Sequence, residues 1–154
     1  MGRNHSTTTR DIVTAIGLSA WVAGLLDLMV TVVPAVHADK PIAPVLAAGR
    51  GLVADPSGTG PLAIAMGLGA HFALMLVVAA IFVLATRKVA LSAAHPVIFG
   101  VLYGAVLFFL LPDHGAPPTG AGGIALAVLR DILCIGLPIG LITWQVQRRT
   151  APAQ

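Results

Sequence analysis

The chain contains no glutamate, and charged residues make up only 10% of its 154 positions. Soluble domains carry about 25% charged residues, so this chain has too little charge to cover a surface that faces water. Hydrophobic residues make up 57% of the sequence. This composition excludes an ordinary soluble domain and indicates an integral membrane protein.

The sequence is also poor in residues and motifs that carry catalysis. Its one cysteine, Cys134, cannot form a disulfide within the chain, and its apolar neighbours in the sequence indicate a small core residue. There is no nucleotide-binding glycine motif, serine nucleophile elbow, CxxC or HExxH pattern. The sequence therefore gives no sign of an enzyme, and no cofactor is predicted.

Long apolar stretches fill most of the chain. A bilayer core about 30 Å thick requires roughly 20 helical residues. The four predicted spans are residues 12–36, 61–86, 95–111 and 122–146. Between the first two spans, residues 41–53 are apolar with little charge, which predicts a short helix on the outer interface. The predicted fold is all-α: one transmembrane domain, residues 1–154, forming an antiparallel four-helix bundle.

The basic residues lie mostly at the ends of these spans, which is a topology signal of membrane proteins. Nucleic acid is therefore not expected as a partner. Six basic residues fall on one side of the predicted membrane and two on the other. The six are Arg3, Arg10, Arg87, Lys88, Arg148 and Arg149, and the two are Lys40 and Arg50. The positive-inside rule then places both termini in the cytoplasm.

A secretory signal peptide is an alternative interpretation of the N-terminus. Arg3 and Arg10 precede the first apolar run, and Val36-His37-Ala38 is a passable cleavage site. However, the run is about 25 residues long, against 7–15 in a signal peptide, and Asp27 interrupts it. A transmembrane helix is therefore the favoured interpretation.

Small residues recur at the spacing that lets helices approach closely. Gly100 and Gly104 form one small-xxx-small motif, and Gly136 and Gly140 form another. We expect these four glycines to lie at helix contacts. Pro138 lies between the glycines of the second motif and predicts a kink, which would free the carbonyl of the residue four positions earlier.

Three predicted spans carry an ionisable residue at a similar depth. Asp27, His71 and Asp131 each lie about three residues from the midpoint of a span, roughly 4–5 Å to the outer side of the bilayer centre. Charge in hydrocarbon is costly, so such residues pair, line a hydrated cavity or are neutral. Tyr103 and Arg130 are candidate partners, although Arg130 points about 100° away from Asp131 around the helix.

Several roles are open for these polar residues. They could form interhelical hydrogen bonds that fix the packing, or relay groups of a proton or ion pathway. One histidine and two carboxylates could bind a metal, although no closely spaced ligand pair supports it. A haem with two histidine ligands would need a second embedded histidine beside His71. A separate alternative is a metal site built from outer-loop residues, namely His37, Asp39, Asp55, Asp113 and His114.

Short patterns in all four spans resemble a family of small, uncharacterised bacterial inner-membrane proteins with four spans. These patterns are Ala23-Gly24-Leu25-Leu26-Asp27, Gly67-x-Gly69-x-His71-Phe72, His95-Pro96-Val97-x-x-Gly100-x-x-Tyr103-Gly104, Gly136-Leu137-Pro138-Ile139 and Arg148-Arg149. The resemblance implies the four-span architecture and a bacterial inner membrane, and implies no activity. Such proteins often carry a histidine where this chain has Asp131, which argues against a transferred metal or haem site.

Taken together, these patterns predict a multi-pass protein of a bacterial inner membrane that acts by binding. The first hypothesis is an accessory or helix-packing subunit, whose partners are the lipid bilayer and other membrane subunits or further copies of itself. The second is a small transporter or proton-coupled carrier with a site at Asp27, His71 and Asp131. The third is a lipid- or cofactor-binding protein that uses a cleft beside Tyr103 and Pro138.

Overall fold

The computed structural model of the chain describes residues 9–38, 61–87, 89, 95–111 and 119–149. The α-helices are α1 (Thr9–His37), α3 (Pro61–Thr86), α5 (Pro96–Leu110), α6 (Gly120–Asp131) and α7 (Leu137–Arg149). A π-helical turn, η1 (Ile132–Gly136), joins α6 to α7. The described ranges contain no strand, so the prediction of an all-α chain is confirmed for them. The interfacial helix predicted at residues 41–53 falls outside them.

Within the described ranges, three helical segments are long and apolar enough to cross a membrane: α1, α3 and the continuous helical run Gly120–Arg149. Helix α5, which corresponds to the predicted third span, has only 15 residues. Its length of about 22 Å is less than the roughly 30 Å of a hydrocarbon core. His95 precedes α5 and Pro96 begins it, as a proline at the first helical position favours. The third span is therefore shorter in the structure than the predicted 95–111.

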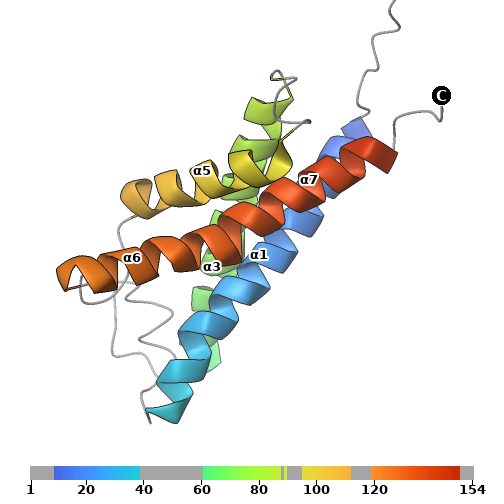
Figure 1. The fold of residues 1–154 in the computed structure, drawn as a ribbon. Helices are drawn as coiled ribbons and strands as arrows, with labels where there is room; N and C mark the ends of the chain where they lie inside the picture. Colours follow the sequence, from blue (N-terminus) through green and yellow to red (C-terminus); the bar gives the residue numbers. More distant parts are fainter. Residues whose placement is uncertain (1–8, 39–60, 88, 90–94, 112–118, 150–154) are drawn as a thin grey trace, which may run out of the picture.

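The helices pack around two main contacts, one made by α1 and the other by α5. Helix α1 lies against α3 and α7, and α5 runs beside α6, η1 and α7 (Figure 1). The core at the centre of these contacts contains Met75, Val78, Ala79, Phe82, Ile135 and Ile139. In contrast, α6 buries none of its residues, and in Figure 1 its N-terminal end points away from the C-terminal end of α1. Packing is therefore tightest from η1 onward, along α7.

The π-helical turn η1 directly precedes Pro138. A proline has no N–H, so the carbonyl of Cys134 cannot accept the usual helical hydrogen bond from residue 138. The N–H of Leu137 instead donates to the carbonyl of Ile132, five residues earlier. A wider turn of this kind lets a helix accommodate a proline within a membrane. The disturbance predicted from Pro138 thus takes the form of a π turn, and the chain stays helical across it.

The four glycines of the two small-xxx-small motifs lie where α5 meets η1 and α7. A Cβ atom on Gly104 would lie 2.6 Å from the Cα of Ile132, and one on Gly100 would lie 2.8 Å from the carbonyl oxygen of Gly136. A Cβ on Gly140 would lie 2.8 Å from the carbonyl oxygen of Pro96. Backbone therefore packs directly against backbone here, which leaves no room for a side chain.

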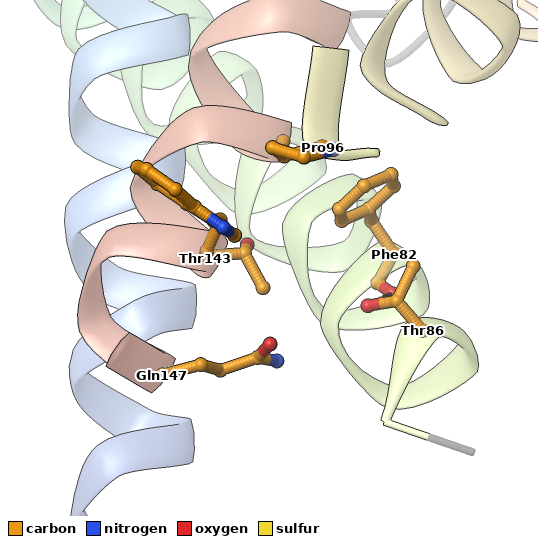
Figure 2. A pocket seen from close by; sticks show the side chains of 7 residues that line it. Phe82, Thr86, Pro96, Thr143 and Gln147 are labelled. Atoms are coloured by element: carbon orange, nitrogen blue, oxygen red, sulfur yellow. Dashed lines mark hydrogen bonds between the residues drawn. The ribbon is translucent and has the colours of Figure 1, made fainter. Parts of the chain in front are cut away.

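The basic side chains gather at one end of the molecule. The start of α1 and the end of α7 lie together in Figure 1, and Thr86 near the end of α3 and Gln147 near the end of α7 line one cavity in Figure 2. Of the five arginines in the described ranges, Arg10, Arg87, Arg148 and Arg149 belong to these ends and are exposed. The guanidinium of Arg148 lies 4.5 Å from the ring centroid of Trp144, a cation–π distance.

Candidate intramembrane polar site

Three ionisable side chains from three helices meet in the interior: Asp27 of α1, His71 of α3 and Arg130 of α6. Asp27 lies on the buried face of α1 with Ala20, Ala23 and Gly24, whose small side chains let α3 approach. The side chains of Asp27 and His71 are each only 3% exposed, whereas that of Arg130 is 28% exposed. We call this group the polar site.

Arg130 joins α6 to α1 through one guanidinium nitrogen. Its Nη2 donates to Oδ1 of Asp27 at 2.6 Å and to the hydroxyl of Thr31 at 2.8 Å. The Thr31 hydroxyl donates in turn to the backbone carbonyl of Asp27 at 2.8 Å. Hydrogen bonds between charged groups are short and strong. The arginine therefore binds a carboxylate and a hydroxyl one helical turn apart on the same face of α1.

His71 joins α3 to α1 through a hydrogen bond from its ring to the backbone of α1. Its Nε2 lies 2.8 Å from the carbonyl oxygen of Gly24, and because a carbonyl only accepts, Nε2 carries the proton and donates. The Nδ1 atom faces Oδ2 of Asp27 at 3.9 Å, which is too far for a direct hydrogen bond. The ring also lies edge-on to Phe72, with centroids 5.3 Å apart. His71 is thus fixed by packing and by a backbone carbonyl.

The structure distributes the predicted site residues over three places. It brings Asp27, His71 and Arg130 together, and it places Asp131 half-buried at the end of α6, with its carbonyl oxygen against Gly104. The Tyr103 hydroxyl reaches α3 about two helical turns beyond His71, where it donates to the carbonyl of Val78 at 2.6 Å. Thr31 is not among the residues predicted from the sequence, although its position four residues after Asp27 puts both on one helix face.

Replacing Tyr103 by phenylalanine is expected to lower the free energy of unfolding by about 1 kcal/mol, the usual net value of one hydrogen bond. The ring would keep its contact with Phe82, whose centroid lies 4.9 Å away. Unfolding by sodium dodecyl sulfate in mixed micelles, followed by circular dichroism, measures the loss. Tyr103→Ala is the matched comparison and should cost about 3 kcal/mol, because it also removes the ring. Equal losses in the two variants would contradict a separate role for the hydroxyl.

In the described part of the chain, no group of three His, Cys, Asp or Glu side chains is close enough to hold a metal ion. Neither predicted metal site is therefore formed by described residues. His37, one of the outer-loop candidates, lies in the last turn of α1, and its ring donates to the carbonyl of Val33 at 2.8 Å. The other four candidates, Asp39, Asp55, Asp113 and His114, fall outside the described ranges.

A small cavity lies at the basic end, apart from the polar site (Figure 2). Its volume is about 10 Å³, which is at the lower limit for a single water molecule. The buried hydroxyl of Thr143 lines it and has no hydrogen-bond partner within the described structure. The other lining residues are Phe82, Thr86, Pro96, Gly140, Trp144 and Gln147. The cavity has room for a bridging water and not for a substrate.

Comparison of the chain with models of protein families, with curated proteins and with solved structures found no match. Function is therefore inferred from the contacts of the described residues alone.

Proposed function

We propose that this chain is a small multi-pass membrane protein that acts through helix packing, either as an accessory subunit of a membrane complex or as a homo-oligomer. The observation that carries this proposal is the way the polar site is closed by its own contacts. Asp27 and His71 are almost fully buried, and Arg130, Thr31 and the Gly24 carbonyl supply their neighbours. A group of charges satisfied in this way holds helices together.

The same contacts argue against a carrier. A proton or ion pathway needs a continuous series of hydrogen-bonded groups or water between the two sides of the membrane. Here the gap between His71 and Asp27 is 3.9 Å, and the arginine already occupies Oδ1 of Asp27. A permanent cation on the only buried acid of α1 would also compete with any transported cation.

The outer surface supports a role in assembly and a place in the membrane. Large apolar side chains are exposed on the long helices and on α5, including Trp21, Met29, Leu62, Leu126 and Phe109. In a bilayer these contact lipid or other helices, and close helix contacts between chains follow from packing and not from charge. We place the basic end in the cytoplasm by the positive-inside rule, in a bacterial inner membrane as the family resemblance implies.

Two measurements on the same preparation test the proposal. Protein extracted directly into polymer-bounded nanodiscs should have a mass above one 15.7 kDa chain plus its lipid. Liposomes that contain the purified protein should be no more permeable to protons or sodium than liposomes without it, and Asp27→Asn should not change this. A single chain per disc together with an ion flux that Asp27→Asn abolishes would overturn the proposal in favour of a carrier.

A further inference from the structure

An apolar groove of about 310 Å³ lies between the end of α3 and the first turns of α5. Four residues at i, i+3, i+4 and i+7 line each wall: Phe82, Ala85, Thr86 and Val89 on one, and Phe99, Leu102, Tyr103 and Val106 on the other. Both walls therefore present one face of a helix or its continuation. The groove forms because α3 and α5 each pack mainly on other helices, α3 on α1 and α5 on η1 and α7.

The groove offers its occupant no free hydrogen-bond donor from its two hydroxyls. The Thr86 hydroxyl donates to the carbonyls of Phe82 and Val83, at 2.8 and 3.3 Å, and the Tyr103 hydroxyl donates to that of Val78. The remaining lining side chains are hydrocarbon. The surface therefore fits an apolar chain and not a polar cofactor.

The length and depth of the groove fit one leaflet. From Phe99 to Val106 its wall spans about 10 Å along α5, roughly two-thirds of the 15 Å of hydrocarbon in half a bilayer. It lies toward the basic end, with one wall running from Phe82 past the end of α3 to Val89 and the other from Phe99 to Val106 of α5. A transmembrane helix from a partner would need a contact stripe along most of the bilayer, whereas an acyl chain of one leaflet needs only this part.

The charge at the mouth of the groove is positive. Arg87 directly follows Thr86 and comes two residues before Val89, both of which line the groove, and its side chain is exposed. Arg10, Arg148 and Arg149 lie at the same end. Among the described residues at this end, Asp11 is the one acidic residue. Basic residues at the cytoplasmic surface attract acidic lipid head groups, by about 1 kcal/mol each.

We propose that this groove binds one acyl chain of an acidic glycerophospholipid from the cytoplasmic leaflet, with the lipid phosphate held at Arg87. This goes beyond the proposed role in helix packing and does not depend on it. The lipid covers apolar surface that α3 and α5 leave open, and its phosphate neutralises a charge beside the membrane interface.

Native mass spectrometry of the delipidated protein in detergent tests this, with phosphatidylglycerol and phosphatidylcholine of identical chains as probes. The wild type should bind one phosphatidylglycerol more tightly than phosphatidylcholine. Arg87→Gln should weaken phosphatidylglycerol binding about fivefold, the equivalent of one surface charge. Phosphatidylcholine binding should weaken less, because the choline ammonium offsets the charge of its phosphate. Leu102→Trp fills the groove from a side chain that is 57% exposed, and should weaken both lipids.

Two matched variants make the result specific. Arg149→Gln removes a charge at the same end away from the groove, and Ile98→Trp adds bulk to an α5 side chain that is 55% exposed and does not line it. Both should bind lipid like the wild type, and circular dichroism should show all four variants folded. Equal effects of Arg87→Gln and Arg149→Gln would overturn the proposal, since binding would then be non-specific. A Leu102→Trp variant that keeps its lipid and changes its oligomeric mass would overturn it in favour of a helix in the groove.

Discussion

Replacing Asp27 by alanine is expected to lower the free energy of unfolding by about 2–3 kcal/mol. The change removes the acceptor of the 2.6 Å hydrogen bond from Arg130 and leaves a guanidinium without its carboxylate inside the helices. Removing one member of a buried ion pair costs about 3–5 kcal/mol. The lower value is expected here because the Arg130 side chain is 28% exposed and can turn partly toward the head groups.

A double-mutant cycle separates the ion pair from the loss of packing. Arg130→Ala alone should cost about 3 kcal/mol, because Asp27 is the more deeply buried partner. The double variant should lose less than the two single losses added together, with a coupling energy of about 1.5 kcal/mol, near the upper end for polar pairs in membrane proteins. Unfolding by sodium dodecyl sulfate, followed by circular dichroism, gives all four free energies.

The control for this cycle is Arg149→Ala, which removes an exposed arginine at the end of α7. Exposed substitutions of this kind usually change stability by less than about 0.5 kcal/mol. If the losses at Asp27 and Arg130 add to within about 0.3–0.5 kcal/mol, the two side chains are energetically independent. The polar site would then not hold α6 to α1, and the proposed packing role would lose its main support.

The depth of a residue in a predicted span indicated that Asp27 and His71 could meet, and the structure places their side chains 3.9 Å apart. Depth does not give the direction in which a side chain points. A shift of one residue turns that direction by about 100°, and this is why depth alone pointed to Asp131, whereas Arg130 makes the 2.6 Å hydrogen bond to Asp27. The length of the arginine side chain adds several ångströms of reach that spacing does not encode.

Other features follow from single residues once the helices are placed. Pro138 signals a disturbed turn, but its position does not show that the disturbance takes the form of a π turn. The groove beside Tyr103 was suggested as a cleft shared with Pro138, and the structure lines it with residues of α3 and α5 instead. Pairing between helices distant in the sequence determines such cavities, and a local pattern carries no information about it.

Replacing Gly136 by alanine is expected to disrupt the packing of α5 and to cost about 3 kcal/mol or more, above the usual range for overpacking. A Cβ atom there would collide with the carbonyl oxygen of Gly100 and would lie 2.7 Å from the backbone nitrogen of Gly104. These neighbours are backbone atoms, so no side chain can turn away, and α5 itself must move. The measurement is again unfolding in mixed micelles.

Gly17→Ala and Gly69→Ala are the matched controls, because each is a glycine inside a helix with nothing within 4 Å of the added Cβ. Alanine favours a helix over glycine by about 0.8–1.0 kcal/mol, so both should leave the protein as stable as the wild type or more so. Gly136→Ala gains the same propensity, so the difference between its stability and that of the two controls measures the collision. A Gly136 variant as stable as these controls would mean that α5 does not pack through its glycines. The position of α5, which forms one wall of the lipid groove, would then not be fixed by this contact.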